Sequence, residues 1–275
     1  MRYIFLIGWL FMGSSLLYAQ GTPPAANRGD KRFQFEVGYL SNSVYLGRQD
    51  SVTTPYITPM FTYYHRSGFY IDCSLSYLPG NAARLDLGTI DLGYLFQAGE
   101  KWSGELYLSK YFYNDRSTAV KSSINTFFSS SLAFDASIIT LNGGVDIGFS
   151  SGTDWFVHYG ISYPFSWGEE QRSWSIEPSI IAYAGTQQFA SRRRLRRPPP
   201  GFSSISISGA NTFNVLDYEF SVPFTYDTDR WGLSIYPTYA VPLNPVAVTL
   251  PNGNTLFKEA LSNNFYGEVK LYIKF

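Results

Sequence analysis

Hydrophobic and polar residues alternate with a period of two along most of the chain. The clearest case is FYGEVKLYIKF, from Phe265 to Phe275, where one parity is apolar or glycine and the other carries a glutamate, two lysines and two tyrosines. A strict period of two predicts a β-strand with one apolar and one polar face. Eleven residues also match the length of a tilted strand that crosses a bilayer.

Twelve segments of this kind follow one another, and helical patterns of useful length are missing because glycine and proline recur too often. A sheet in lipid must close on itself so that no edge is left unpaired. The pattern therefore predicts an all-β chain that forms a closed antiparallel transmembrane β-barrel. The segments lie near 33–46, 55–65, 68–78, 85–97, 101–113, 122–134, 138–150, 154–166, 173–186, 212–226, 230–241 and 264–275.

Aromatic residues stand at both ends of the apolar faces, which a soluble β-sandwich or propeller would not need. Aromatic rings suit the boundary between lipid headgroups and hydrocarbon. One expected girdle consists of Phe33, Phe69, Trp102, Phe165, Trp174, Trp231 and Phe275. The other consists of Tyr45, Tyr77, Phe149, Trp155, Phe213 and Phe265.

The lengths of the connections give the orientation of the barrel. Connections at the end that holds both termini are short, whereas the long segments 187–211 and 242–263 lie at the opposite end. Outer-membrane barrels have short periplasmic turns and longer extracellular loops. The termini are therefore expected in the periplasm. The short turns are 65–68, 97–101, 134–137 and 226–230.

The N-terminus has the pattern of a secretory signal peptide. Arg2 precedes an apolar run that ends at LYA, with small Ala19 at the cleavage point. We expect a signal peptide at 1–19, a periplasmic tail at 20–32 and the barrel at 33–275. No second apolar run is long enough for a helical span, and Cys73 is the only cysteine, so no intramolecular disulfide can form.

The mature chain resembles the outer-membrane β-barrel proteins of Gram-negative bacteria, through its even strand number, its two aromatic girdles and its terminal Phe275. The resemblance implies location in the cell outer membrane. It also implies that Phe275 is the assembly signal presented to the barrel-assembly machinery. No named family is indicated by a signature of its own.

Residues of the opposite parity to the apolar faces are expected to line the lumen. The set is mostly acidic, which indicates either a hydrated interior or a field that favours cations. Inward tyrosines would narrow the bore. The candidates are Glu36, Asp72, Asp91, Glu105, Asp146, His158, Glu177, Asp217, Glu219, Glu268 and Lys270, with Lys274 near the end.

A hairpin centred on Gly152 is expected to set Asp146 opposite His158. A cross-strand ion pair is favoured over a proton-responsive or catalytic pair. With His65 as the only other histidine, no triad has a place to form, and no phosphate loop or metal-ligand spacing occurs. No catalytic residue, metal or cofactor is predicted, and an enzyme is not expected.

Five arginines, followed by three prolines, are expected in an extracellular basic loop. The loop could gate an acidic lumen, hold lipopolysaccharide phosphates or dock a partner, and a solvated surface loop is the plain alternative. The near-neutral net charge favours no nucleic acid. The arginines are Arg192, Arg193, Arg194, Arg196 and Arg197.

The function expected from these patterns is a narrow diffusion or uptake channel for small solutes. The alternative is a non-conducting barrel that serves as a subunit of an outer-membrane secretion, assembly or surface complex. The expected partners are outer-membrane lipid and lipopolysaccharide, the barrel-assembly machinery during biogenesis, and a candidate outer-membrane protein complex.

Overall fold

The computed structural model describes residues 11–12, 19–20, 32–50, 52–80, 83–169, 171–190, 206–249 and 255–275. Most of the expected signal peptide, the tail up to residue 31 and all five arginines of the basic loop lie outside these residues. Within the expected signal peptide and at its end, two short strands pair with each other, β1 (Phe11–Met12) and β2 (Ala19–Gln20).

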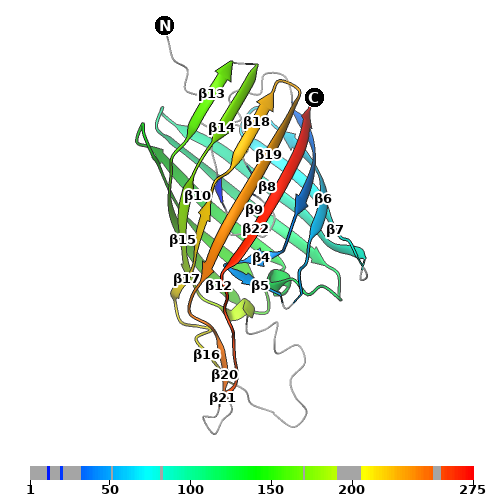
Figure 1. Cartoon of the computed structure of the whole chain (residues 1–275), viewed down its shortest axis with the longest axis vertical. Helices are drawn as coiled ribbons and strands as arrows, with labels where there is room; N and C mark the ends of the chain where they lie inside the picture. The colour runs from blue at the N-terminus through cyan, green and yellow to red at the C-terminus, as the bar shows by residue number, and fades with distance from the viewer. Residues whose placement is uncertain are drawn as a thin grey trace.

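Twelve antiparallel strands form a closed barrel (Figure 1). Each pairs with two neighbours, and β22 closes the ring by pairing with both β3 and β19. The ring consists of β3 (Phe33–Leu40), β6 (Tyr56–Tyr64), β7 (Phe69–Leu78), β8 (Arg84–Ala98), β9 (Trp102–Tyr113), β10 (Thr126–Asp135), β11 (Thr140–Phe149), β12 (Thr153–Ser162), β15 (Ser179–Gly185), β17 (Asn214–Ser221), β19 (Trp231–Pro242) and β22 (Asn264–Lys274).

Three shorter strands continue three members of the ring toward the end that holds the termini. They are β13 (Phe165–Glu169), β14 (Arg172–Ile176) and β18 (Phe224–Thr228), which extend β12, β15 and β17. A proline lies at each break. Proline has no backbone N–H to donate to the neighbouring strand, so the β-ladder is interrupted there. The prolines are Pro164, Pro178 and Pro223, and Pro237 lies unbroken within β19.

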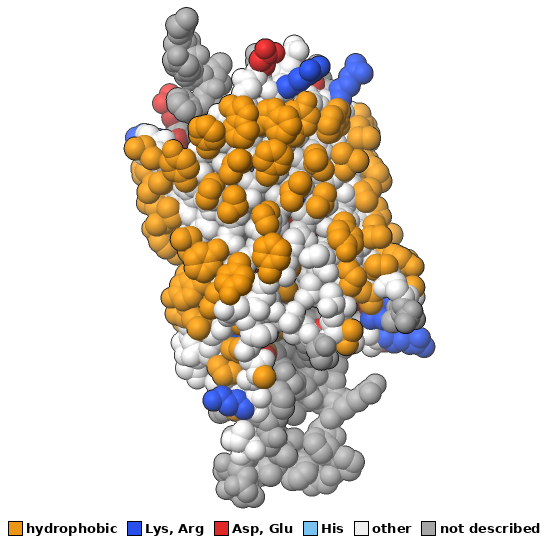
Figure 2. Space-filling view, viewed as in Figure 1, with side chains coloured by type: hydrophobic (Ala, Val, Ile, Leu, Met, Phe, Trp, Pro, Cys, Tyr) orange, Lys and Arg blue, Asp and Glu red, His pale blue; other side chains and the backbone are white. Residues whose placement is uncertain are grey.

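The period of two in the sequence is the period of burial in the structure. In β3, β7 and β12, exposed and buried residues alternate almost without error. The exposed set is apolar, and it forms a broad belt around the barrel, with charged side chains above and below it (Figure 2). Such a belt is the surface that a membrane barrel presents to hydrocarbon. Among the described residues, no helix is long and apolar enough to span a bilayer.

The short turns and the long connections lie at opposite ends of the barrel, as predicted. The end of the barrel opposite the termini is here called the mouth. Beyond the mouth, a three-stranded sheet projects below the barrel in Figure 1. It pairs the connection after β15 with the connection between β19 and β22. Its strands are β16 (Ser206–Ser208), β20 (Ala247–Thr249) and β21 (Thr255–Lys258).

Several inward aromatic rings lie over glycines of the neighbouring strand. Tyr70 lies over Gly93, and His158 lies over Gly144, in each case where a Cβ atom on the glycine would collide with the ring. The ring fills the space that the missing side chain leaves. These inward rings therefore pack flat against the barrel wall. Tyr272 over Gly232 is a third pair of this kind.

The prediction of a strand over 33–46 is wrong after residue 40. β3 ends at Leu40, and the next residues turn into the barrel instead of extending its wall. Tyr45, expected in the outer girdle, is 1% exposed for this reason. The other girdle residues are on the outer surface.

We expect the purified barrel to resist unfolding in detergent until it is heated. Every wall strand is paired on both sides, so no strand can leave without breaking two ladders. Electrophoresis without boiling should show a faster-migrating folded form, and boiling should convert it to the position of the unfolded chain. A chain that migrates identically with and without boiling would contradict the closed ring.

Candidate functional site: a plugged mouth above a polar interior

Residues 41–50 and 52–55, here called the plug loop, close the mouth of the barrel from inside. It leaves the wall at Leu40 and rejoins it at Tyr56, and these two residues pair with each other. Between them, β4 (Val44–Tyr45) and β5 (Arg48–Gln49) form a small hairpin. The plug loop is thus an insertion into an otherwise continuous β-hairpin of the wall.

The hairpin turns at two residues with positive φ, Leu46 at 49° and Gly47 at 69°. Two positive φ values in a two-residue turn match the twist of the strands that it joins. Gly47 is also pressed against Pro242, where a Cβ atom would lie 2.9 Å from the proline Cα. A larger residue at position 47 would therefore push the plug loop out of its seat.

Aromatic residues pack around the tip of the plug loop. The ring of Tyr45 makes edge contacts with Phe156 and Phe189, at centroid distances of 6.2 and 4.9 Å. Phe156 comes from the wall strand β12, and Phe189 comes from the connection that follows β15. Both phenylalanines are fully buried. The upper interior is therefore a small apolar core made by loops and wall together.

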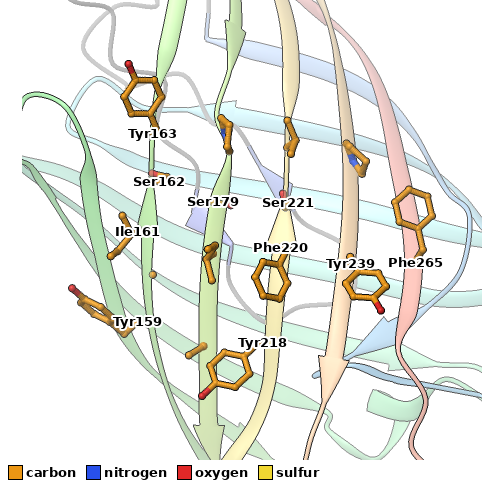
Figure 3. Close-up of a pocket in the computed structure, with 16 residues that line it drawn as sticks. Tyr159, Ile161, Ser162, Tyr163, Ser179, Tyr218, Phe220, Ser221, Tyr239 and Phe265 are labelled. Atoms are coloured by element: carbon orange, nitrogen blue, oxygen red, sulfur yellow. The ribbon is translucent and has the colours of Figure 1, made fainter.

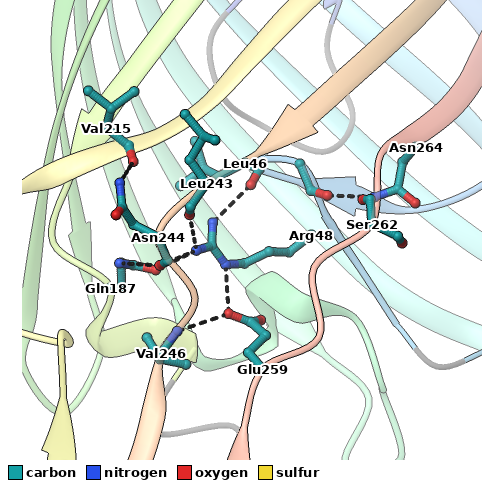
Figure 4. A network of polar contacts seen from close by, with 11 residues as sticks. Leu46, Arg48, Gln187, Val215, Leu243, Asn244, Val246, Glu259, Ser262 and Asn264 are labelled. Carbon is teal, nitrogen blue, oxygen red and sulfur yellow. Dashed lines mark hydrogen bonds and ion pairs between the residues drawn. The ribbon is translucent and has the colours of Figure 1, made fainter.

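Arg48 ties the plug loop to two other connections (Figure 4). Its guanidinium donates to the carbonyl oxygens of Leu243 and Asn244 and forms an ion pair with Glu259 at 3.3 Å. It also donates to Gln187 Oε1 and to the carbonyl of Leu46 within the plug loop. Burial lowers the pKa of Arg48, and Glu259 and Asp217 oppose this shift. Five acceptors around one buried cation make this contact a latch.

A second cation enters the mouth from the short helix η2 (Val120–Ser123), which lies between β9 and β10. Lys121 is 1% exposed, and its Nζ atom donates to the hydroxyl of Tyr111 at 2.6 Å. The same atom lies 4.3 Å from the ring centroids of Tyr111 and Phe127, and 5.4 Å from that of Tyr45. Such contacts stabilise a desolvated ammonium group.

We expect η2 to dock more weakly as the pH falls. Burial lowers the pKa of Lys121 from 10.5 to about 7, although Asp91 and Asp146 raise it. The undocked lysine is protonated below pH 10.5, whereas the docked lysine is protonated only below about pH 7. As the pH falls from 10.5 to 7, the free-energy cost of docking the lysine therefore increases, and below pH 7 this cost is constant. Hydrogen exchange at η2, corrected for intrinsic rates, should become faster as the pH falls from 10.5 to 7, by at most about tenfold for each pH unit.

Lys121→Met is the matched variant for this experiment, because it keeps an unbranched side chain and removes the charge. The variant should lose the pH dependence of exchange at η2. An unchanged slope would show that another group titrates.

The inner wall is polar, and all eleven candidate residues are buried. Lys270 stands between Glu36 and Glu268, at 3.6 Å from each. Asp72 and Asp91 are cross-strand neighbours on β7 and β8. Glu105 accepts a hydrogen bond from Tyr70 at 2.6 Å. Several of the expected acids are thus held in small clusters. Asp217 and Glu219 lie on β17, and Glu177 lies just before β15.

Asp146 and His158 make the expected contact, with Nδ1 3.2 Å from Oδ2, but not in the expected register. The turn is centred on Ser151 and not on Gly152, because Phe149 pairs with Thr153. His158 therefore stands opposite Gly144 and reaches Asp146 diagonally. Ser129 donates a second hydrogen bond to Asp146 at 2.6 Å. The contact joins three wall strands and fits an ion pair that fixes register.

Arg48, Lys121 and Asp86 are charged interior residues that the alternation does not predict. Arg48 and Lys121 come from connections, where the alternation along the wall strands does not determine the direction of a side chain. Asp86 lies at a register shift in β8, which turns it inward although its parity is opposite to that of Asp91. A signal for Arg48 was present in LG at 46–47, a turn sequence directly after an apolar pair. No comparable signal marks Lys121. Lys274 lies at the rim that holds the termini, where it pairs with Asp227 at 2.6 Å. Among residues the structure describes, no group of three or more histidine, cysteine or acidic side chains is arranged to hold a metal ion.

Comparison with known proteins gives likeness at the level of fold. No family model matches the chain, and no curated protein matches it. A solved structure titled KdgM porin has 9% identity and a TM-score of 0.47, over 88% of this chain and 99% of its own. LpxR from Salmonella typhimurium has the same identity and TM-score, over 88% and 100%. A NanC porin structure has 8% identity and a TM-score of 0.43, over 88% and 98%.

Because each TM-score is below 0.5, the fold is assigned from strand pairing rather than from these likenesses. The pairing closes twelve antiparallel strands into one ring. The outer surface of that ring is an apolar belt with aromatic residues at both ends. The chain is a closed twelve-stranded antiparallel β-barrel of the outer-membrane type.

Proposed function

We propose that the protein is a gated outer-membrane channel for small polar solutes, closed at the mouth by the plug loop. The observation that carries the proposal is the contrast between a polar inner wall and a mouth sealed only by connections. No wall strand crosses the lumen among the described residues. The plug loop can therefore move without any change in the barrel.

The inner wall supports passage of water and solutes once the plug loop moves. Carboxylates cost several kcal/mol each to bury away from water unless they are paired. A barrel that needed only to be filled could use apolar residues, as the upper interior does around Tyr45. Among the described residues, the interior holds eleven buried acids and three buried cations, Arg48, Lys121 and Lys270. This balance favours neutral or cationic solutes. The basic loop at 192–197 is expected to modulate entry from outside.

The direct test removes the plug loop and measures conductance in planar bilayers. Residues 42–54 are replaced by Asn-Gly, a two-residue turn that fits the pairing of Leu40 with Tyr56. The wild type should be mostly closed, and the deleted form should conduct with a reversal potential on the cation side. A deleted form that folds, inserts and conducts no ions would exclude the channel.

The second candidate function is that of a non-conducting barrel subunit in a larger outer-membrane complex. One observation favours this function. The inner side chains are almost fully buried even below the plug loop, with Asp72 at 1% and Lys270 at 2% exposure. A filled interior suits a structural barrel as well as a closed channel. Under this alternative, the deleted form stays silent in bilayers and the intact protein purifies with a stable partner from outer membranes.

A further inference from the structure

The three-stranded sheet beyond the mouth is connected directly to the residues that hold Arg48. Leu243 and Asn244 lie between β19 and β20, and Glu259 directly follows β21. Gln187 lies in the connection that leads to β16. Each acceptor that the guanidinium finds outside the plug loop therefore lies on a segment that enters or leaves this sheet.

One carboxylate oxygen joins the sheet to the plug loop (Figure 4). Glu259 Oε2 lies 3.3 Å from Arg48 Nε and also accepts the backbone N–H of Val246 at 3.3 Å. The Glu259 N–H in turn donates to the Val246 carbonyl at 2.9 Å. Val246 and Glu259 form the base of the β20–β21 pair, next to Ala247 and Lys258. Separation of the two strands at this base removes the donor that holds the carboxylate against Arg48.

Asn244 is the bend between the wall and the sheet. Its φ of 54° lies in the left-handed region, which asparagine adopts more readily than most residues. Its side-chain amide donates to the Val215 carbonyl on β17 at 2.7 Å. Its own carbonyl accepts from Arg48 and from Gln187, at 3.2 and 3.1 Å. A shift of β20 relative to the wall therefore changes the positions of the acceptors around Arg48.

The sheet is less firmly held than the wall. Its three strands pair with each other and with no wall strand. The wall strands β17, β19 and β22 lie side by side, each paired with two neighbours, next to an apolar hollow of about 770 Å³ on the outer surface (Figure 3). The sheet therefore moves relative to the wall at a lower cost than any wall strand. With the termini in the periplasm, the sheet stands outside the cell.

We propose that the three-stranded sheet controls the position of the plug loop. When β20 and β21 are paired at their base, Asn244 and Glu259 together surround Arg48, and the mouth is closed. When an external contact separates the two strands, Arg48 loses these acceptors and the plug loop is released. This inference gives the regulation of the proposed channel and rests on that function. It requires no change in any wall strand.

The test weakens the β20–β21 pair without removing an atom of the latch. Because the Val246 carbonyl points to β21, the N–H of Val248 also points to β21 and that of Thr249 points to β16. Val248→Pro removes the first donor, and Thr249→Pro, the matched control, removes the second. The position of the plug loop is read from a parent barrel that carries Ser43→Cys and Cys73→Ser. Ser43 is 2% exposed, so a membrane-impermeant maleimide modifies a cysteine there only after the plug loop moves.

We expect modification in the Val248→Pro barrel to be about fivefold faster than in the parent, the change that loss of one hydrogen bond gives. Thr249→Pro should stay close to the parental rate. Equal rates in the parent and Val248→Pro, both folded by heat-modifiability, would overturn the proposal. Equal acceleration by the two proline variants would also overturn it, because the β20–β21 base would then have no special role.

A disulfide changes the same pairing in the opposite direction. Ala247 and Lys258 form a pair without ladder bonds between them, and the Cα distance of about 4.5 Å in such pairs is one that a disulfide spans. In a Cys73→Ser background, the Ala247→Cys, Lys258→Cys barrel should open less often in bilayers when oxidised than after reduction. Identical recordings in the two states would count against the proposal.

The barrel without the plug loop separates failure of this inference from failure of the channel. If that barrel is silent while Val248→Pro still speeds modification at position 43, the channel is excluded and control of the plug loop by the sheet stands. If it conducts and Val248→Pro does not change the modification rate, the channel stands and this control is excluded.

Discussion

Arg48→Ala should open the barrel. The substitution removes the guanidinium that joins the plug loop to Glu259 and to the carbonyls of Leu243 and Asn244. Removing one partner of a buried, hydrogen-bonded charge pair costs about 3–5 kcal/mol, since the groups left behind stay unpaired. The equilibrium between seated and released plug loop would then shift by on the order of a hundredfold or more. Single-channel recordings should show a large rise in open probability.

The controls for this experiment separate the latch from charge in general. Arg116→Ala removes an exposed arginine from another mouth connection and should leave the recordings unchanged. Arg48→Lys should give an intermediate opening, because an ammonium group cannot reach all the acceptors that the planar guanidinium spans. Closed recordings from a folded, inserted Arg48→Ala barrel would show that the latch does not hold the plug loop.

Phe275→Lys should sharply reduce the amount of protein in the outer membrane. Phe275 and Phe33 form two backbone hydrogen bonds, each of 2.9 Å. These are the last bonds of the pairing between the first and last wall strands, which closes the barrel. The two rings lie 6.1 Å apart. Loss of this ring pair costs about 1 kcal/mol, and a lysine at the membrane boundary adds up to about 1 kcal/mol. Quantitative immunoblots of outer-membrane fractions give the measurement.

Phe69→Lys is the matched control, because Phe69 belongs to the same girdle and contacts Tyr94 at 4.7 Å. It loses a similar ring pair but lies away from the closing seam. We expect its membrane level to fall much less than that of Phe275→Lys. Equal losses in the two variants would remove any special role for the terminal residue in assembly.

The wall of the barrel was predictable because its chemistry is repetitive. In β7 and β12 each residue faces either lipid or the interior, so burial repeats every second position and the sequence carries the same period. The strand number, the positions of the girdles and the short turns follow from that one rule. The prediction was less accurate where a turn determines the register of two strands, as at Ser151. Moving the centre of that turn by one residue changes the cross-strand partner of each residue by two positions.

The plug loop was not predictable from the same rule. A strand over 33–46 would turn Tyr45 outward to the lipid, whereas Val44, Tyr45 and Leu46 are all buried in the structure. Only the geometry of the turn at Gly47 decides that they fold into the lumen. Arg48 finds its partners about 139 to 211 residues away along the chain. Contacts of that kind depend on how distant connections meet and leave no local period.

The inward rings that lie over glycines have a consequence for how relatives of this protein can vary. The space beside Gly93 is already taken by Tyr70, and the space beside Gly144 by His158. Neither partner of such a pair can change freely: a side chain at the glycine needs a smaller residue across the ladder, and a lost ring leaves a hole in the wall. Substitutions at the two positions should therefore be correlated among homologues. Each correlated pair would fix the register of two neighbouring strands in a homologue from its sequence alone.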